Sequence, residues 1–218
     1  MSGSKMNEDK LKSKKIKWIV GVLLFFTLYA TVRYIIFKGV DPVHFPMYIT
    51  NKILSTSGLF FIALSYSWGK LKGLKPNDKN LENQFVKFLG LAGFSCSAMH
   101  VFISMIILSP EYYQKLYEGN MMNLKGELSM LMGVFSIYCF SIPAITTIPF
   151  MQEAVGINKW QRGQRIGYLG LFTALLHVLS MGVPGWLRVA DWPGYLPPIT
   201  LIATIIAVFP LYLKFVKR

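Results

Sequence analysis

The sequence predicts an all-α membrane protein built as a bundle of six transmembrane helices. The chain of 218 residues is 53% hydrophobic and only 15% charged, with a mean hydropathy of +0.44, whereas soluble domains are about a quarter charged. Six apolar stretches approach the roughly 20 helical residues that cross a hydrocarbon core of about 30 Å. In addition, basic residues gather in alternate connections between these stretches.

The predicted helices take up nearly the whole chain. They are 16–37, 46–68, 87–109, 127–149, 166–187 and 198–213, of which the last is the shortest. We expect residues 1–15 to form a basic cytoplasmic tail and residues 16–218 to form one six-helix domain. A separate soluble domain is not expected, because no room remains for one and the sequence contains no glycine-rich dinucleotide-binding motif.

Charge predicts the orientation of these helices. Most of the 23 lysines and arginines fall into four groups: Lys5, Lys10, Lys12, Lys14, Lys15 and Lys17; Lys70, Lys72, Lys75, Lys79 and Lys87; Lys159, Arg162 and Arg165; and Lys214, Lys217 and Arg218. The positive-inside rule then places both termini in the cytoplasm. The net charge of +13 is explained as a topology signal. A lipid bilayer, and not a nucleic acid, is therefore the expected partner of the basic residues.

Two histidines lie inside predicted helices, each in an apolar stretch. His100 follows Lys87 by about 13 residues and His177 follows Arg165 by about 12, so at 1.5 Å per residue both lie roughly 18–20 Å from the inner boundary. The two helices run in the same direction. Small residues recur at the same offsets on the face of each histidine: Ser97, Gly93 and Gly90 before His100, and Ala174, Gly170 and Gly167 before His177.

This pair of histidines admits two interpretations. A flat macrocycle held between two helices needs such small-residue grooves, and axial histidines are a common way to hold haem iron. Alternatively, the small residues serve close helix packing, and the histidines form hydrogen bonds between helices. Zinc is disfavoured, because no third and fourth protein ligand is evident. A second haem is not expected, because its ligand positions would be Lys87 and Gln164. We expect His44 to be a surface residue.

Several segments together resemble a known family. "LYATVRYII" contains Arg33, "TNKIL" opens the second helix, "LGLAGFSCSAMHV" leads to His100, "PAITTIP" ends the fourth helix, "GYLGLFTALLHVL" leads to His177, and "GYLPPIT" opens the sixth. In order and spacing these segments are similar to the transmembrane domain of the STEAP metalloreductases, within the ferric-reductase-like membrane superfamily. The resemblance implies a homotrimer of six-helix subunits, each with one b-type haem bound by His100 and His177 on the outer side.

The same resemblance implies an FAD bound from the cytoplasmic side. The positions that match the flavin region are Lys87, Trp160, Gln164 and Arg165. Phe140 falls where the family has a bulky apolar residue between flavin and haem, about 5 Å inward of the histidines by helix rise. Without the resemblance, Lys87 and Arg165 are explained by topology alone, and Trp160 by an aromatic anchor at the membrane interface.

The sequence also suggests residues that bind the substrate on the outer face and a source of electrons on the inner face. Arg33 and Arg188 are expected to attract an anionic ferric chelate such as citrate. The STEAP family has a fused cytoplasmic NADPH-binding domain before the first helix, and only a short segment precedes it here. We therefore expect a separate cytoplasmic NAD(P)H–flavin reductase as partner; the alternatives are that free reduced flavin enters or that the chain has a different donor.

These inferences predict a metalloreductase of the cell membrane. Its electrons would pass from cytoplasmic reduced flavin, through one bis-histidine haem, to extracytoplasmic Fe³⁺ or Cu²⁺ complexes. One alternative is a haem-bearing electron-transfer subunit for a membrane or periplasmic partner such as a methionine-sulfoxide reductase, with quinol or flavin as donor. The other alternative is a haem-free channel or scaffold, in which the histidines serve packing.

Overall fold

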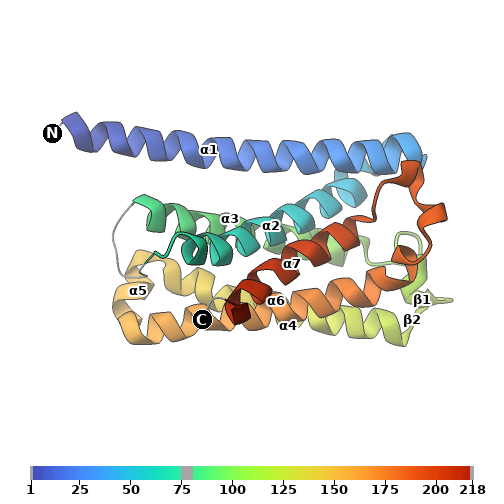
Figure 1. Cartoon of the computed structure of the whole chain (residues 1–218). Coiled ribbons are helices and arrows are strands. Elements are labelled where there is room, and N and C mark those ends of the chain that lie inside the picture. The colour runs from blue at the N-terminus through green and yellow to red at the C-terminus, as the bar shows by residue number, and fades with distance from the viewer. Residues whose placement is uncertain (1, 75–80, 217–218) are drawn as a thin grey trace.

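The computed structural model describes residues 2–74 and 81–216, with side chains from residue 7 onward. Lys75, Lys79, Lys217, Arg218 and the side chain of Lys5 therefore lie outside the described residues. Six long helices form an elongated bundle (Figure 1). They are α1 Ser2–Ala30, α2 Thr50–Leu71, α3 Leu81–Ile107, α4 Leu124–Thr147, α6 Ile157–Trp186 and α7 Ile199–Val216.

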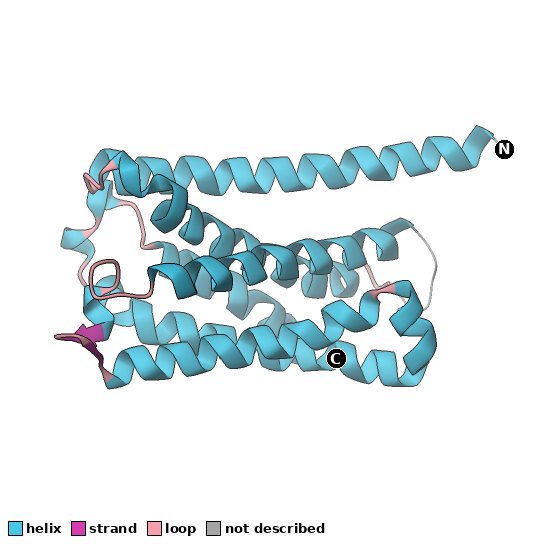
Figure 2. Cartoon of the chain, turned by 180° about the vertical axis from the view of Figure 1, so that it is seen from behind, coloured by secondary structure: helices cyan, strands magenta, loops and turns pink. Residues whose placement is uncertain are grey.

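Short elements connect the long helices, as the view from behind shows (Figure 2). The π-helical segment Thr31–Phe37 extends α1, and the turns Pro42–His44 and Phe45–Ile49 lead into α2. The turn Gln114–Leu116 and the antiparallel strands β1 Tyr117–Glu118 and β2 Met121–Met122 join α3 to α4. Helix α5 Pro149–Val155 precedes α6, and the turns Val189–Asp191 and Pro193–Tyr195 precede α7.

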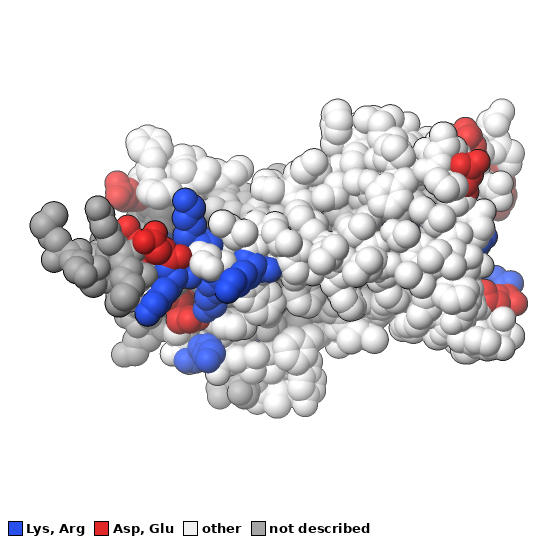
Figure 3. Space-filling view, turned by 90° about the horizontal axis from the view of Figure 1, so that it is seen from above, with Lys and Arg blue, Asp and Glu red and all other residues white. Residues whose placement is uncertain are grey.

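Six helices are long and apolar enough to cross a membrane. The chain is therefore a multi-pass membrane protein, as the sequence predicts. Apolar side chains on the outward faces, such as Phe102, Leu131 and Phe209, are exposed, which suits contact with lipid tails. Figure 3 shows charged side chains at both ends of one face and a wide uncharged band between them.

The two ends of the bundle hold different connections. Figure 1 shows the start of α1 together with α5 at one end, and β1 and β2 at the other. We call these the α5 end and the hairpin end. Helices α3 and α6 both begin at the α5 end and run toward the hairpin end. The helices that contain His100 and His177 are therefore parallel.

Two polar segments differ from the predicted boundaries. Helix α1 already begins at Ser2, within the predicted tail, and residues 150–165, predicted as a loop, form α5 and the first turns of α6. Lys14 Nζ lies 2.8 Å from Glu82 Oε1 and 4.3 Å from the centre of the Phe85 ring. The indole of Trp68 donates to the same carboxylate at 2.7 Å. These contacts with α2 and α3 hold the polar start of α1 against the bundle.

The small residues of α3 and α6 serve close helix packing. A Cβ on Gly93 would lie 2.7 Å from Ile62 of α2, and a Cβ on Gly58 of α2 would lie 2.6 Å from the Ser97 hydroxyl. On α6, a Cβ on Gly170 would lie 2.7 Å from the Phe140 ring of α4. The expectation that these grooves leave clearance for a macrocycle is therefore wrong, because neighbouring helices fill them.

Candidate functional site

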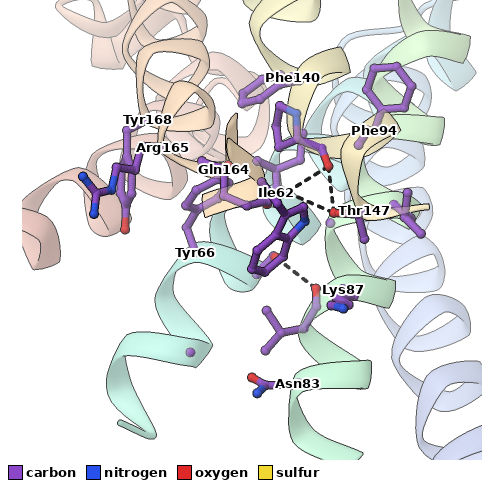
Figure 4. A pocket seen from close by; sticks show the side chains of 18 of the residues that line it. Ile62, Tyr66, Asn83, Lys87, Phe94, Phe140, Thr147, Gln164, Arg165 and Tyr168 are labelled. Atoms are coloured by element: carbon purple, nitrogen blue, oxygen red, sulfur yellow. Dashed lines mark hydrogen bonds between the residues drawn. The ribbon is translucent and has the colours of Figure 1, made fainter. Parts of the chain in front are cut away.

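A cavity of about 550 Å³ opens among α2, α3, α4 and α6, toward the α5 end. Its lining includes all five residues that the sequence assigned to the flavin region or to its path outward: Lys87, Phe140, Trp160, Gln164 and Arg165. Figure 4 shows Lys87 on α3 and Gln164 on α6 in the lining of this cavity, with Phe140 farther from Lys87 than Gln164 is. We call this space the α5-end cavity. It falls within the size range of cofactor and ligand sites.

The α5-end cavity is cationic and aromatic. Lys70, Lys87 and Arg165 line it, and none of its described lining residues is Asp or Glu. The aromatic lining residues are Tyr66, Phe94, Phe140, Trp160 and Tyr168. Such a lining suits a ligand that combines a flat ring with anionic groups, because cations pair with phosphate oxygens and aromatic faces pack against the ring.

Trp160 is buried in the wall of this cavity. Only 5% of its surface is exposed, and Lys87 Nζ lies 5.3 Å from the centre of its ring. Lys87 also donates to the Gln152 side-chain oxygen at 2.9 Å. The Trp160 indole nitrogen is buried without a hydrogen-bond partner. A membrane-interface anchor would face lipid, so the anchor interpretation does not fit this position.

Gln164 joins α6 to the end of α4. Its side-chain amide donates to the Pro143 carbonyl and to the Thr147 hydroxyl, each at 3.1 Å. The backbone carbonyl of Gln164 accepts from the Tyr66 hydroxyl at 2.8 Å. An amide held in this way has no unprotonated nitrogen to offer a metal ion. Gln164 is therefore suited to shape the cavity wall and not to ligate iron.

His100 and His177 lie beyond Phe140, toward the hairpin end. Both side chains keep part of their surface accessible. On α6, His177 follows Gly170, the residue beside Phe140, by about seven residues, which is about 10 Å of helix. This separation is larger than the 5 Å expected from the sequence, because α4 and α6 run in opposite directions with a register that depth counting did not provide.

His100 has a fixed protonation pattern. Its Nδ1 lies 2.7 Å from Asn51 Oδ1 on α2. Asn51 is buried, and its amide nitrogen donates to the Ser104 and Tyr113 hydroxyls at 2.9 and 3.0 Å. With Asn51 Oδ1 facing His100, as the structure places it, Nδ1 holds the ring proton. A neutral imidazole protonated at Nδ1 has its lone pair on Nε2.

His177 has the same pattern through a different partner. Its Nδ1 donates to the backbone carbonyl of Ser129 on α4 at 2.7 Å, and the Ser129 hydroxyl lies 3.1 Å away. A carbonyl oxygen only accepts, so Nδ1 is again protonated and Nε2 holds the lone pair. Gly133 makes this approach possible, because a Cβ there would lie 2.9 Å from Nδ1. Within the described residues, neither Nε2 atom has a hydrogen bond.

The donor atoms of this pair, and not the filled small-residue grooves, are what would suit a metal with its other ligands on a macrocycle. The described residues contain no cluster of three or more His, Cys, Asp or Glu side chains that could hold a bare metal ion. Two neutral imidazoles, each with an unbonded Nε2 lone pair, are ligands of the kind that a six-coordinate haem iron takes. Donation from each Nδ1 to an oxygen orients the ring and strengthens it as a ligand.

A second pocket of about 820 Å³ lies at the hairpin end. Its charged lining residues are Arg33, Lys38, Lys52, Lys115, Lys125 and Arg188, against Glu111 and Asp191. We call it the hairpin-end pocket. The excess of cations attracts anionic ligands. Met181, about one turn beyond His177 on α6, and Lys52, next to Asn51 on α2, both line it, so this pocket adjoins the histidine pair from the side opposite the α5-end cavity.

Both arginines predicted for substrate binding line the hairpin-end pocket, but they differ in availability. Arg33 is only 6% exposed, and its guanidinium donates to the Leu196 carbonyl. Arg33 therefore mainly ties the end of α1 to the loop before α7. Arg188 is exposed and lies 3.6 Å from Asp191, an exposed ion pair that a ligand can replace at little cost.

The sequence interpretation missed Asn51, Ser129, Gly133 and Tyr113. Asn51 stood in the quoted segment "TNKIL", and a buried amide in an apolar helix is itself a signal of function. No protein-family model matches the chain, and no curated protein matches it.

Proposed function

We propose that this protein is a STEAP-like transmembrane metalloreductase. It would pass electrons from a cytoplasmic reduced flavin, through one b-type haem held by His100 and His177, to chelated Fe³⁺ or Cu²⁺ outside. In this proposal the α5 end and both termini are cytoplasmic, the membrane is the cell membrane, and the chain assembles as a homotrimer. The quoted sequence segments and the basic residues near the α5 end support these assignments.

One observation supports the proposal above all others. Two imidazoles on parallel helices have Nδ1 bound to an oxygen and Nε2 free. The bound haem would supply a one-electron carrier at this depth. The protein residues orient both rings, keep them neutral and surround the pair with apolar helices.

The α5-end cavity supports the choice of flavin as the donor-side cofactor. Lys87 and Arg165 would pair with the pyrophosphate of FAD, and Trp160 and Phe140 would border its ring system. A separate NAD(P)H-dependent reductase would deliver the reducing equivalents from the cytoplasm. The hairpin-end pocket, with six cationic side chains against two acids, would hold the anionic chelate.

The visible absorption spectrum of the detergent-purified protein tests this proposal. We expect a low-spin b-type spectrum with a sharp α-band after reduction by dithionite, at one haem per chain. His100→Ala and His177→Ala should each abolish that spectrum. The matched control is His44→Ala, because His44 lies outside the pair and packs on Tyr112 at 5.6 Å; this variant should keep the spectrum.

A featureless spectrum after haem supplementation would contradict the proposal and favour the scaffold alternative. So would a haem-replete, low-spin double variant without both histidines. If haem binds but ferric citrate is not reduced in vesicles, the electron-transfer-subunit alternative gains support. Reduction only in the presence of an added flavin reductase would support the expected partner.

A further inference from the structure

The two histidines are held by different kinds of partner. His177 Nδ1 donates to a main-chain carbonyl inside the bundle. His100 Nδ1 instead donates to a side-chain amide, that of Asn51, which continues to the Tyr113 hydroxyl. Tyr113 lines the hairpin-end pocket. A short chain of hydrogen bonds therefore connects His100, and not His177, to the outer pocket.

Asn51 has no freedom to break this connection by rotating. Only 2% of its surface is exposed, and its oxygen and both amide hydrogens are used, by His100, Ser104 and Tyr113. An amide flip would place its nitrogen against the protonated Nδ1, so it would require the His100 ring proton to move to Nε2 and both hydroxyls to turn and donate. Buried amides with all partners satisfied are rigid. The amide therefore transmits polarisation between its two ends.

Tyr113 is suited to respond to a ligand. It lies between α3 and α4, outside both helices, and burial raises the pKa of its hydroxyl. The hydroxyl therefore keeps its proton at neutral pH and can donate a hydrogen bond. Its oxygen accepts from Asn51 at 3.0 Å, while its O–H is available to Ser104 or to a ligand oxygen in the pocket.

We propose that Asn51 and Tyr113 form a positioning relay through which a carboxylate ligand in the hairpin-end pocket alters the electron-donating strength of His100. The inference rests on the proposed haem ligation by His100. When a carboxylate accepts a hydrogen bond from the Tyr113 O–H, the phenol oxygen becomes a stronger acceptor for the Asn51 amide. The amide oxygen then draws more strongly on the Nδ1 proton, because hydrogen bonds in a chain polarise one another. A more electron-rich imidazole stabilises ferric iron.

The first test needs no haem. Nitrogen-15 NMR of the histidine rings in the haem-free protein should show His100 almost entirely protonated at Nδ1. Asn51→Leu should turn this signal into a mixture of tautomers, while His177 keeps its own. An unchanged His100 signal in Asn51→Leu would overturn the role of Asn51. Tyr113→Phe should keep the tautomer, because Asn51 remains in place.

The second test uses the haem-loaded protein and sodium citrate as the probe. Citrate should bind the oxidised form about threefold more tightly than the reduced form, which corresponds to about 28 mV at 59 mV per tenfold for one electron. Tyr113→Phe should reduce this ratio by at least half while citrate still binds. The matched control is Tyr112→Phe, since Tyr112 also lines the pocket but lies outside the relay; it should keep the full ratio.

The outcomes separate the two proposals. A protein with the expected His100 tautomer but no haem spectrum would place the failure in the proposed function. A haem-loaded Tyr113→Phe variant that binds citrate with the wild-type ratio would overturn the relay, because a through-space effect of the anion would then explain the whole shift. Absence of citrate binding to the wild-type protein would also overturn it.

Discussion

Replacing Gly133 by alanine would disturb His177 without touching its chemistry. The added methyl would lie 2.9 Å from Nδ1 and 3.1 Å from Cε1 of His177, several tenths of an ångström inside normal contact. The ring must move away, which stretches its 2.7 Å hydrogen bond to the Ser129 carbonyl. Overpacking costs about 1–3 kcal/mol and the lost hydrogen bond about 1 kcal/mol. The better helix propensity of alanine returns about 1 kcal/mol, so we expect a net loss of about 2 kcal/mol.

Thermal unfolding in detergent, followed by circular dichroism, measures this loss, and the visible spectrum reports whether haem is retained. The matched control is Gly163→Ala in the same pair of helices, where the new methyl would lie 3.6 Å from Ile142 and Thr146 and should be neutral or stabilising. Gly133→Ala should also lower haem occupancy more than Gly163→Ala does. Equal stability and equal haem content in the two variants would refute the position assigned to the His177 ring.

Two further predictions concern the α5 end. Gly167→Ala should displace the Tyr66 ring, because the new methyl would overlap its hydroxyl. FAD added to the purified protein should then bind at least tenfold more weakly, as measured by fluorescence titration. Unchanged FAD affinity would exclude the α5-end cavity as the FAD site. Lys14→Met should lower the unfolding temperature only slightly, because Lys14 and Glu82 are 32% and 40% exposed and such pairs contribute under about 1 kcal/mol. The difference should shrink further in high salt, and a salt-independent loss would contradict this explanation.

The sequence predicted the membrane helices well because hydropathy is a local property. All six predicted spans end within three residues of the ends of their helices, the π-helical extension of α1 included, whereas the first and fifth begin 14 and 9 residues inside α1 and α6. Predictions failed where helices are polar: the start of α1, and residues 150–165, which form α5 and the beginning of α6. A polar helix at the membrane surface has the composition of a loop, and its stability comes from contacts such as Lys14 with Glu82 that lie far apart in the sequence.

For the site, depth counting and resemblance selected residues that the fold gathers around one cavity, but they could not supply the neighbours. Helical offsets placed Gly93 and Gly170 on the faces of the histidines, yet an offset does not state which helix covers a face. Helices α2 and α4 cover these faces. The sequence also does not state which helices pack together. Asn51 and Ser129 could therefore not be recognised as histidine partners before α2 was known to pack on α3 and α4 on α6.

The partners of the two imidazoles bear on the choice between packing and ligation. Both are neutral oxygens, the Asn51 amide and the Ser129 carbonyl. A carboxylate would strengthen each ligand more, but it would place an anion at a depth where charge is expensive and would favour protonation of the ring. A histidine kept only for packing is expected to satisfy both nitrogens, as buried polar groups do. Here each ring uses Nδ1 alone, and within the described residues neither Nε2 atom has a hydrogen bond. Packing accounts for the bound nitrogens, and the proposed haem would account for the free ones.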